Sequence, residues 1–267
     1  MAIMNKSYKE ILWKRTQIKR DTWERKYHLL FRNVLNNDFK MLADRIDVTN
    51  YSSNTVLGWM SKSPMEKMFI QMYRAVGAAF ARDSYQQLKA ESQNMMFKSE
   101  EELVDTWYNE MMNWVRTRAT ERIVSITASS RELAKRIIRG VIETSANEGW
   151  GADVTARAIK KGLIQKGVEM NQWRALRIAR TEIVTASNEG SFMGAQSLGY
   201  PLDKFWIATY DSRTRDTHLV IEQQNPKAMD EAFDVGTYKM QKPGDPAGGA
   251  EEVINCRCSI AFKIKGI

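Results

Sequence analysis

The chain contains 267 residues with a net charge of +8, and 43% of the residues are hydrophobic and 10% aromatic. This composition suffices for one large domain or two ordinary ones, and it excludes a largely disordered protein. No apolar run approaches the ~18 residues of a membrane span, and the first residues lack the apolar core of a signal peptide. We therefore expect no membrane association, and we expect the protein to stay in the reducing cytoplasm where it is made.

Positive charge is concentrated near the N-terminus. Residues 1–45 contain eleven Lys/Arg and five Asp/Glu. A basic arm of this kind is typical of surfaces that bind phosphates or an acidic protein. Because acidic residues interrupt it, an ordinary solvated helix face is the alternative. The candidate contacts for nucleic acid or a protein partner are Lys14, Arg15, Lys19, Arg20, Arg25 and Lys26.

Proline is scarce in the first three quarters of the chain, where Pro64 is the one example before residue 200. This part can therefore be continuously helical. Residues 5–47 place apolar side chains on one helix face, and a helix of that length would reach ~60 Å. We predict a protruding helix or helical hairpin that packs against another subunit. Apolar stripes within residues 65–80 and 103–115 predict further helices.

Capping signals predict the boundaries of the helices that follow. Ser130 is the expected N-cap of one helix. Asp153 is expected to begin the next helix and Gly167 to end it, since glycine commonly follows a helix C-terminus. A last helix is predicted within residues 171–199, and it too finishes on glycine.

The last quarter of the chain has a different pattern. It contains four prolines, together with aromatic and β-branched stretches that predict strands at about 203–210 and 253–264. The predicted fold class is α+β, mostly α. A long helical N-terminal region, residues 1–128, is expected to precede a small α+β C-terminal domain with a short sheet, residues 129–267.

Cys256 and Cys258 are the only cysteines in the chain. A disulfide between them is disfavoured, because residues i and i+2 of a strand lie ~6.6–6.8 Å apart and the compartment is reducing. A second interpretation is a metal site formed with His218 and Asp211, a ligand set that suits zinc. Against it, the spacing is not the C-x₂-C of familiar zinc sites. We expect two reduced, buried thiols that hold the last strand against the segment of His218.

Three separated stretches, "RTEIVTASNEG", "DSRTRDTH" and "INCRC", resemble in order and spacing the phage Mu F-like head morphogenesis family. The resemblance covers about residues 130–264, so it places this family's domain in residues 129–267. After His218 the chain lacks the glycine-containing turn common in the family. The family's signature falls on Arg180, Thr181, Glu182, Asn188, Asp211 to Arg215, His218, Asn255, Cys256, Arg257 and Cys258.

The resemblance implies a structural minor capsid protein of a tailed phage. Such a protein would dock on the portal vertex and act in head assembly or genome ejection. The implied partners are the portal protein and other head or scaffold proteins. The implied location is the virion, in the head interior or at the portal vertex, with the host cytoplasm as the place of assembly.

Two other functions are open from the sequence. One is a nucleic-acid-binding internal head protein that contacts the packaged genome through the basic arm. The other is a metal-dependent, nuclease-like enzyme carried in the head, in which Glu182 and Glu189 share a helix face and His218 acts as general base. The chain has no nucleophile elbow, phosphate-cradling glycine loop or H-E-x-x-H motif. We therefore expect no catalytic residues, and no cofactor unless zinc is bound.

Overall fold

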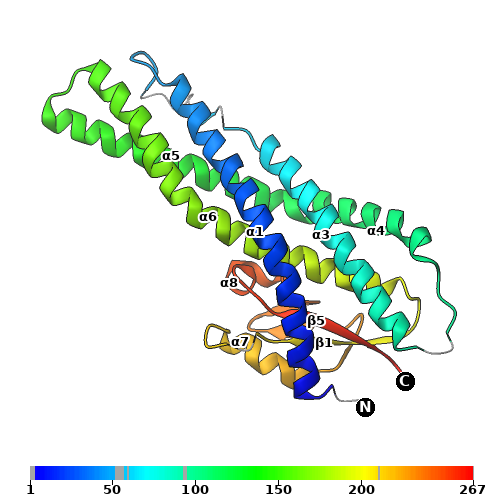
Figure 1. Cartoon of the computed structure of the whole chain (residues 1–267). Coiled ribbons are helices and arrows are strands. Elements are labelled where there is room, and N and C mark those ends of the chain that lie inside the picture. Colours follow the sequence, from blue (N-terminus) through cyan, green and yellow to red (C-terminus); the bar gives the residue numbers. More distant parts are fainter. Residues whose placement is uncertain (1–3, 52–56, 59, 93–94, 210, 267) are drawn as a thin grey trace. The chain divides into compact units, whose positions relative to one another are not determined.

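The structure is a computed structural model that describes residues 4–51, 57–58, 60–92, 95–209 and 211–266. Long helices make up most of it: α1 (Lys6–Arg45), α3 (Ser63–Ala90), α4 (Glu100–Trp114), α5 (Thr120–Glu148) and α6 (Ala152–Gln196) (Figure 1). Short elements follow: β1 (Leu202–Ile207), α7 (Asp216–Leu219), β2 (Lys227–Ala228), β3 (Phe233–Val235), β4 (Tyr238–Met240), α8 (Gly249–Val253) and β5 (Ser259–Ile264). The predicted fold class, α+β and mostly α, is confirmed.

The chain forms two compact units that are interleaved in sequence. We call the first the sheet unit; it consists of Met1–Lys26, Ile70–Thr117 and Ala179–Ile267. The second, the helical unit, consists of Tyr27–Phe69 and Arg118–Ile178. Helices α1, α3 and α6 each contribute residues to both units. The domain boundary expected after residue 128 falls within α5.

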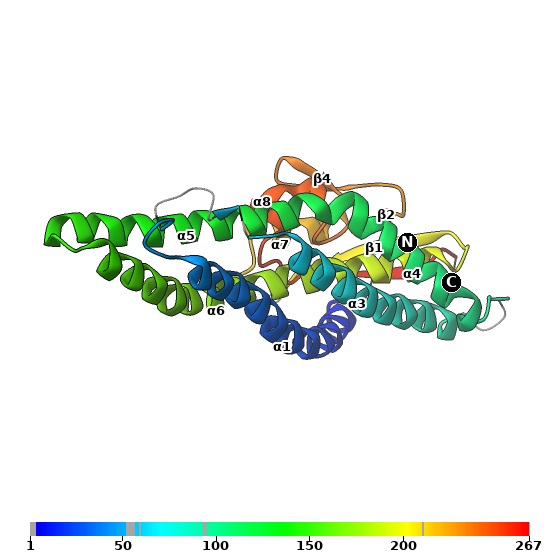
Figure 2. The ribbon, with the colours of Figure 1, turned by 90° about the horizontal axis from the view of Figure 1, so that it is seen from above.

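The helical unit is built around an apolar core. Phe39, Leu42 and Ala43 of α1 pack with residues of α5 and α6, two helices that lie side by side in two perpendicular views (Figures 1 and 2). A Cβ atom at Gly167 would lie 2.4 Å from Cδ1 of Phe39. Gly167 was expected to end a helix, but it lies inside α6 and lets the Phe39 ring approach the helix backbone. The expected N-cap Ser130 is likewise inside α5.

Helix α1 does not protrude. Its side chains at Tyr27, Phe31, Leu35, Phe39 and Leu42 are 0% exposed. Nearer the N-terminus, Leu12 packs in the sheet unit against apolar residues of β1 and β5. The prediction that residues 5–47 extend away to meet another subunit is therefore wrong. The apolar face of α1 is covered by other parts of this same chain.

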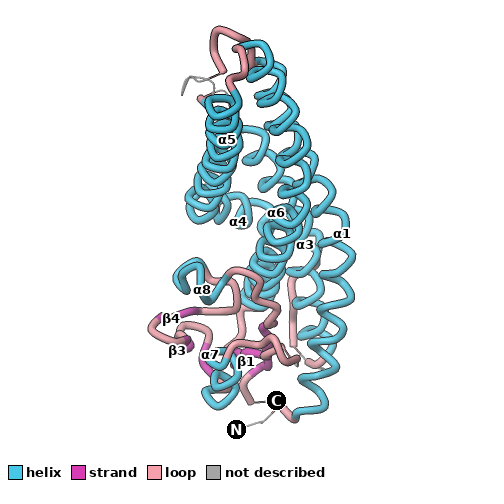
Figure 3. Tube along the Cα trace, turned by 90° about the vertical axis from the view of Figure 1, so that its left-hand side faces the viewer, coloured by secondary structure: helices cyan, strands magenta, loops and turns pink. Residues whose placement is uncertain are grey.

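A three-stranded antiparallel sheet has the order β2-β1-β5. Leu202 pairs with Ile264 and Ile207 with Ser259. Strands β3 and β4 form a separate hairpin, and in Figure 3 all strands lie close to α7 and α8. Both predicted strands exist, but the second begins at Ser259, after α8 and a turn, so the cysteines precede the strand.

Helices α3 and α6 approach very closely in the sheet unit. A Cβ atom at Gly190 would lie 2.1 Å from the carbonyl oxygen of Gly77, and one at Gly194 would lie 2.1 Å from that of Ala81. Only glycine allows such backbone contact. This packing fixes the part of α6 that carries the polar residues described below.

Among the described residues, no helix is long and apolar enough to cross a membrane.

Candidate functional site

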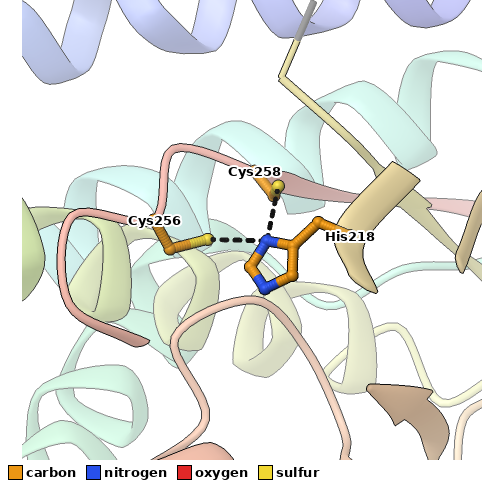
Figure 4. A group of neighbouring side chains, drawn as sticks. All are labelled: His218, Cys256 and Cys258. Carbon is orange, nitrogen blue, oxygen red and sulfur yellow. Dashed lines mark hydrogen bonds between the residues drawn. The ribbon is translucent and has the colours of Figure 1, made fainter. Parts of the chain in front are cut away.

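The two cysteines and His218 converge in the sheet unit (Figure 4). His218 is on α7, and the cysteines lie in the segment between α8 and β5. Nδ1 of His218 is 3.3 Å from Sγ of Cys258 and 3.7 Å from Sγ of Cys256. All three residues are at most 2% exposed. Both thiols are free, so the prediction of reduced, buried cysteines is confirmed.

A carboxylate approaches the opposite side of the His218 ring. Nε2 of His218 lies 2.9 Å from Oε2 of Glu252, a residue of α8 that is 6% exposed. The contact is close but not aligned as a hydrogen bond. Thr217 donates a 2.9 Å hydrogen bond to the same oxygen. Glu252 therefore faces Nε2 on one side of the ring, while Nδ1 faces the two sulfurs on the other.

The two thiols have opposite acidities. Burial works to raise the pKa of Cys258, but hydrogen bonds from Cys256 and His218 outweigh it and lower this pKa well below the usual value. The hydrogen bond with Cys258, with burial added, raises the pKa of Cys256. Cys258 is therefore the more readily ionised of the two thiols.

A buried arginine holds the backbone beside the cluster. Arg20 is 2% exposed, and the carbonyl of Cys258 accepts a 3.1 Å hydrogen bond from it. Burial lowers the pKa of this guanidinium to about 10, against the opposing effect of the two nearby cysteines. Its other partners are Oγ of Ser187 at 2.7 Å, Oδ1 of Asn188 at 2.7 Å and Oγ of Ser259 at 3.0 Å. Arg20 thereby ties α1 to α6 and β5.

Arg20 therefore does not belong to an exposed basic surface, which corrects one predicted contact. The other predicted contacts are exposed: Lys14, Arg15, Lys19, Arg25 and Lys26. Lys14 pairs with Glu10 at 2.7 Å, and Lys19 pairs with Asp83. The sequence carries no local signal that distinguishes Arg20, because its partners are 167 or more positions away.

Several signature residues fix the turn that carries the cysteines. Asn255 has a positive φ of 58°, and its backbone N–H donates a 3.0 Å hydrogen bond to Oγ1 of Thr181. Arg215 donates to the carbonyl of Ile254 at 2.6 Å. Asn188 donates to the carbonyl of Cys258 at 3.1 Å. The turn is therefore held on both sides of Cys256.

Other signature residues make contacts away from the cysteines. Arg180 pairs with Glu24 at 2.9 Å, and Tyr73 donates a 2.6 Å hydrogen bond to Glu182. Glu182 and Glu189 do lie on α6, but Glu189 pairs with Lys242 at 2.9 Å. The carboxylate that the structure places beside His218 is that of Glu252, at 2.9 Å.

Asp211 lies apart from the cluster of ligand atoms. Arg257 donates a 2.8 Å hydrogen bond to its Oδ1. That contact, with a smaller contribution from Arg213, lowers the pKa of Asp211 to about 2. Within the described part of the chain, the potential metal ligands that converge are those of His218, Cys256 and Cys258. Sequence reasoning found these three but missed Glu252, whose role depends on how α8 folds back over α7.

About half of the chain matches a known protein family. Residues 131–261 match the model of the family described as Phage Mu protein F like protein. This part of the chain belongs to the phage Mu F-like family, as the sequence motifs predicted. Membership indicates a phage head-related protein.

The chain is also similar to NAD(+)--arginine ADP-ribosyltransferase EFV of Enterococcus faecalis (strain ATCC 700802 / V583), with 32% identity over 139 residues. The match covers 51% of this chain, which spans only 27% of the relative's length. No solved structure shows a significant match.

Proposed function

We propose that this protein is a structural minor capsid protein of a tailed phage that docks on the portal vertex and acts in head assembly or genome ejection. The observation that carries the proposal is the family match over residues 131–261, which includes all three signature stretches. The contacts of the signature residues support the proposal. Polar groups of four of them bond within the chain, as expected of a rigid structural protein: Arg180, Thr181, Glu182 and Asn188.

The exposed basic residues of α1 supply the surface for docking. Arg15 and Arg25 are both exposed, and neither belongs to the buried network of Arg20. Electrostatic attraction of such residues to an acidic partner mainly increases the association rate and sets orientation. We expect them to face an acidic surface of the portal protein.

The test is binding of the full chain to purified portal protein. Charge reversal in the double variant Arg15→Glu/Arg25→Glu should weaken binding about tenfold, equivalent to ~1.4 kcal/mol. Lys40→Glu, an exposed position on the same helix but in the helical unit, is the matched control and should bind as wild type. Equal binding by wild type, the double variant and Lys40→Glu would show that the basic residues of α1 are not part of the interface. A wild-type protein that does not bind the portal protein would contradict docking altogether.

The same variants separate a nucleic-acid function from a portal function. If the arm binds packaged DNA, affinity for any DNA sequence should fall steeply with salt, with a logarithmic slope of about −0.9 per phosphate contacted. The double variant should then show a shallower slope. Portal binding that is lost while DNA affinity stays unchanged would assign the arm to the protein partner.

Our proposal for this chain does not include the transferase activity named for the relative. Nearly three quarters of that protein lies outside the matched stretch, which leaves ample chain to carry the named activity. We therefore propose that the shared stretch is a head-related module without transferase activity. The expected result is no transfer of ADP-ribose from NAD(+) to arginine by the purified chain. Transfer above a no-protein blank would overturn this part of the proposal.

A further inference from the structure

We propose that His218, Cys256 and Cys258 bind one Zn²⁺ ion through Nδ1 and the two Sγ atoms, with a water molecule as the fourth ligand. This site goes beyond the proposed head function and does not depend on it. The ligand types are those that zinc prefers, and the cluster lies within one compact unit (Figure 4).

The distances fit a tetrahedral zinc site. With Zn–S of about 2.3 Å and Zn–N of about 2.05 Å, neighbouring N and S ligands of a tetrahedron lie about 3.5 Å apart. The observed Nδ1–Sγ distances of 3.3 and 3.7 Å fall on either side of that value. All three ligand atoms lie within 4.8 Å of one another. An ion can therefore reach all three without a change in the backbone.

Hydrogen bonding alone explains the arrangement less well. Nδ1 of an imidazole offers either one lone pair or one proton, so it can form one good hydrogen bond. Here it faces the sulfurs of both Cys256 and Cys258. A cation placed among the three atoms interacts with all of them at once. This convergence of two sulfurs on one nitrogen is the central observation for the metal.

The groups behind the ligands have the arrangement found in metal sites. A metal-bound histidine usually contacts a carboxylate, carbonyl or water through its other ring nitrogen. In His218 the other nitrogen, Nε2, meets Glu252 at 2.9 Å, and Thr217 holds the same carboxylate. Glu252 thus orients the ring so that Nδ1 points at the sulfurs.

The cysteine segment is also held in place before any ion binds. Arg20 and Asn188 both donate to the carbonyl of Cys258, and Thr181 accepts from the N–H of Asn255. The guanidinium of Arg20 also offsets the negative charge of nearby thiolates. A preformed site reduces the ordering that binding would otherwise require.

Burial decides what the ion does. His218, Cys256 and Cys258 are at most 2% exposed, so an ion held among them is shielded from the solvent and from larger molecules. With Asp211 held by Arg257, the chain supplies three ligands at this position. The fourth therefore falls to water, and the ion serves to stabilise the junction of α7, α8 and β5 rather than to catalyse a reaction.

The experiment measures metal in the full chain, purified without chelator from zinc-supplemented cells. Elemental analysis should find about one equivalent of zinc in wild type and a background level in Cys256→Ala/Cys258→Ala. The matched control is Glu252→Gln, which keeps all three ligands. It should bind one equivalent with an affinity lower by about 10–100-fold in a chelator competition. Zinc retained by the double alanine variant, or wild type that takes up no added zinc, would overturn the site.

A spectroscopic readout remains available if the variants fold poorly. Wild type stripped of metal and loaded with Co²⁺ should show the intense visible bands of a tetrahedral ion and thiolate-to-cobalt charge transfer in the near ultraviolet. His218→Ala should weaken the visible bands but keep the charge transfer. Octahedral, thiolate-free cobalt spectra in wild type would contradict the proposal.

Discussion

The two compact units bury different kinds of side chains. The helical unit closes around apolar residues such as Phe39, Leu42 and Leu163, and Asp38 is the buried acidic or basic side chain among its described residues. The sheet unit buries ionisable groups as well: Arg20, Glu182, Glu189, Lys204, His218, Lys242 and Glu252. Apolar packing tolerates modest changes of shape, whereas a buried charge must keep its partners. The sheet unit should therefore be the more sensitive to single polar substitutions.

The largest effect is expected from Arg20→Met. The change removes a buried guanidinium together with its hydrogen bonds to Ser187, Asn188 and the Cys258 carbonyl. Breaking such a network costs about 3–5 kcal/mol. Urea unfolding of wild type and variant measures the loss. The matched control, Arg25→Met, is exposed on the same helix and should change stability by no more than ~0.5 kcal/mol. Similar stabilities for the two variants would show that the Arg20 contacts contribute little.

A smaller effect is expected from glycine substitutions, and it should differ between the units. Gly190→Ala sets a methyl group against the backbone of α3, which cannot move aside locally, whereas Gly167→Ala meets the rotatable ring of Phe39. We expect Gly190→Ala to cost about 1–3 kcal/mol or more, and Gly167→Ala to cost less.

Thermal unfolding of both glycine variants checks the order. Gly140→Ala in α5 serves as control, because an added Cβ there meets nothing within 4 Å. It should stabilise the protein by ~0.5–1 kcal/mol through helix propensity. A larger loss of stability for Gly167→Ala than for Gly190→Ala would mean that α3 and α6 separate more readily than the Phe39 ring reorients.

The smallest effect concerns the one strongly perturbed carboxyl described in the helical unit. Burial raises the pKa of Asp38 to about 6, with Arg174 acting in the opposite direction. A raised pKa means that the folded state resists ionisation, so stability falls as pH rises from about 4 to about 6. Asp38→Asn removes this cost. It should stabilise the protein at pH 7 by on the order of 1 kcal/mol, a value discounted for residual solvent contact.

Urea unfolding as a function of pH tests the Asp38 prediction. The advantage of Asp38→Asn should shrink toward zero as the pH falls below 3.8, where the carboxyl of Asp38 becomes protonated in the folded and the unfolded state alike. A variant that is less stable than wild type at pH 7 would show that the attraction to Arg174 outweighs burial.

The same contrast explains which features could be predicted from the sequence. Periodicity gave the extent of α1 almost to the residue, Lys6–Arg45 against the predicted 5–47, since helix faces are a local property. Single-residue capping signals failed at Ser130 and Gly167, because contacts made across the helical unit decide what those residues do. Ser99 and Glu102 form a reciprocal capping box at the start of α4, a stronger sequence signal that our prediction did not include.

The site could be predicted only in part. His218, Cys256 and Cys258 could be grouped from the sequence by ligand type, and the structure confirms that they converge. Arg20 and Glu252 could not be assigned, because their roles depend on contacts with residues 34 to 239 positions away. Asp211 had the right chemistry for a ligand, but Arg257 holds it elsewhere.

The position of the protein in the phage head tests the account most directly. Electron cryomicroscopy of purified heads, with quantitative mass spectrometry of the same preparation, would locate the chain and count its copies relative to the portal protein. Our account predicts a few copies per head, confined to the portal vertex. Absence from assembled heads, or an even distribution over the capsid shell, would contradict it.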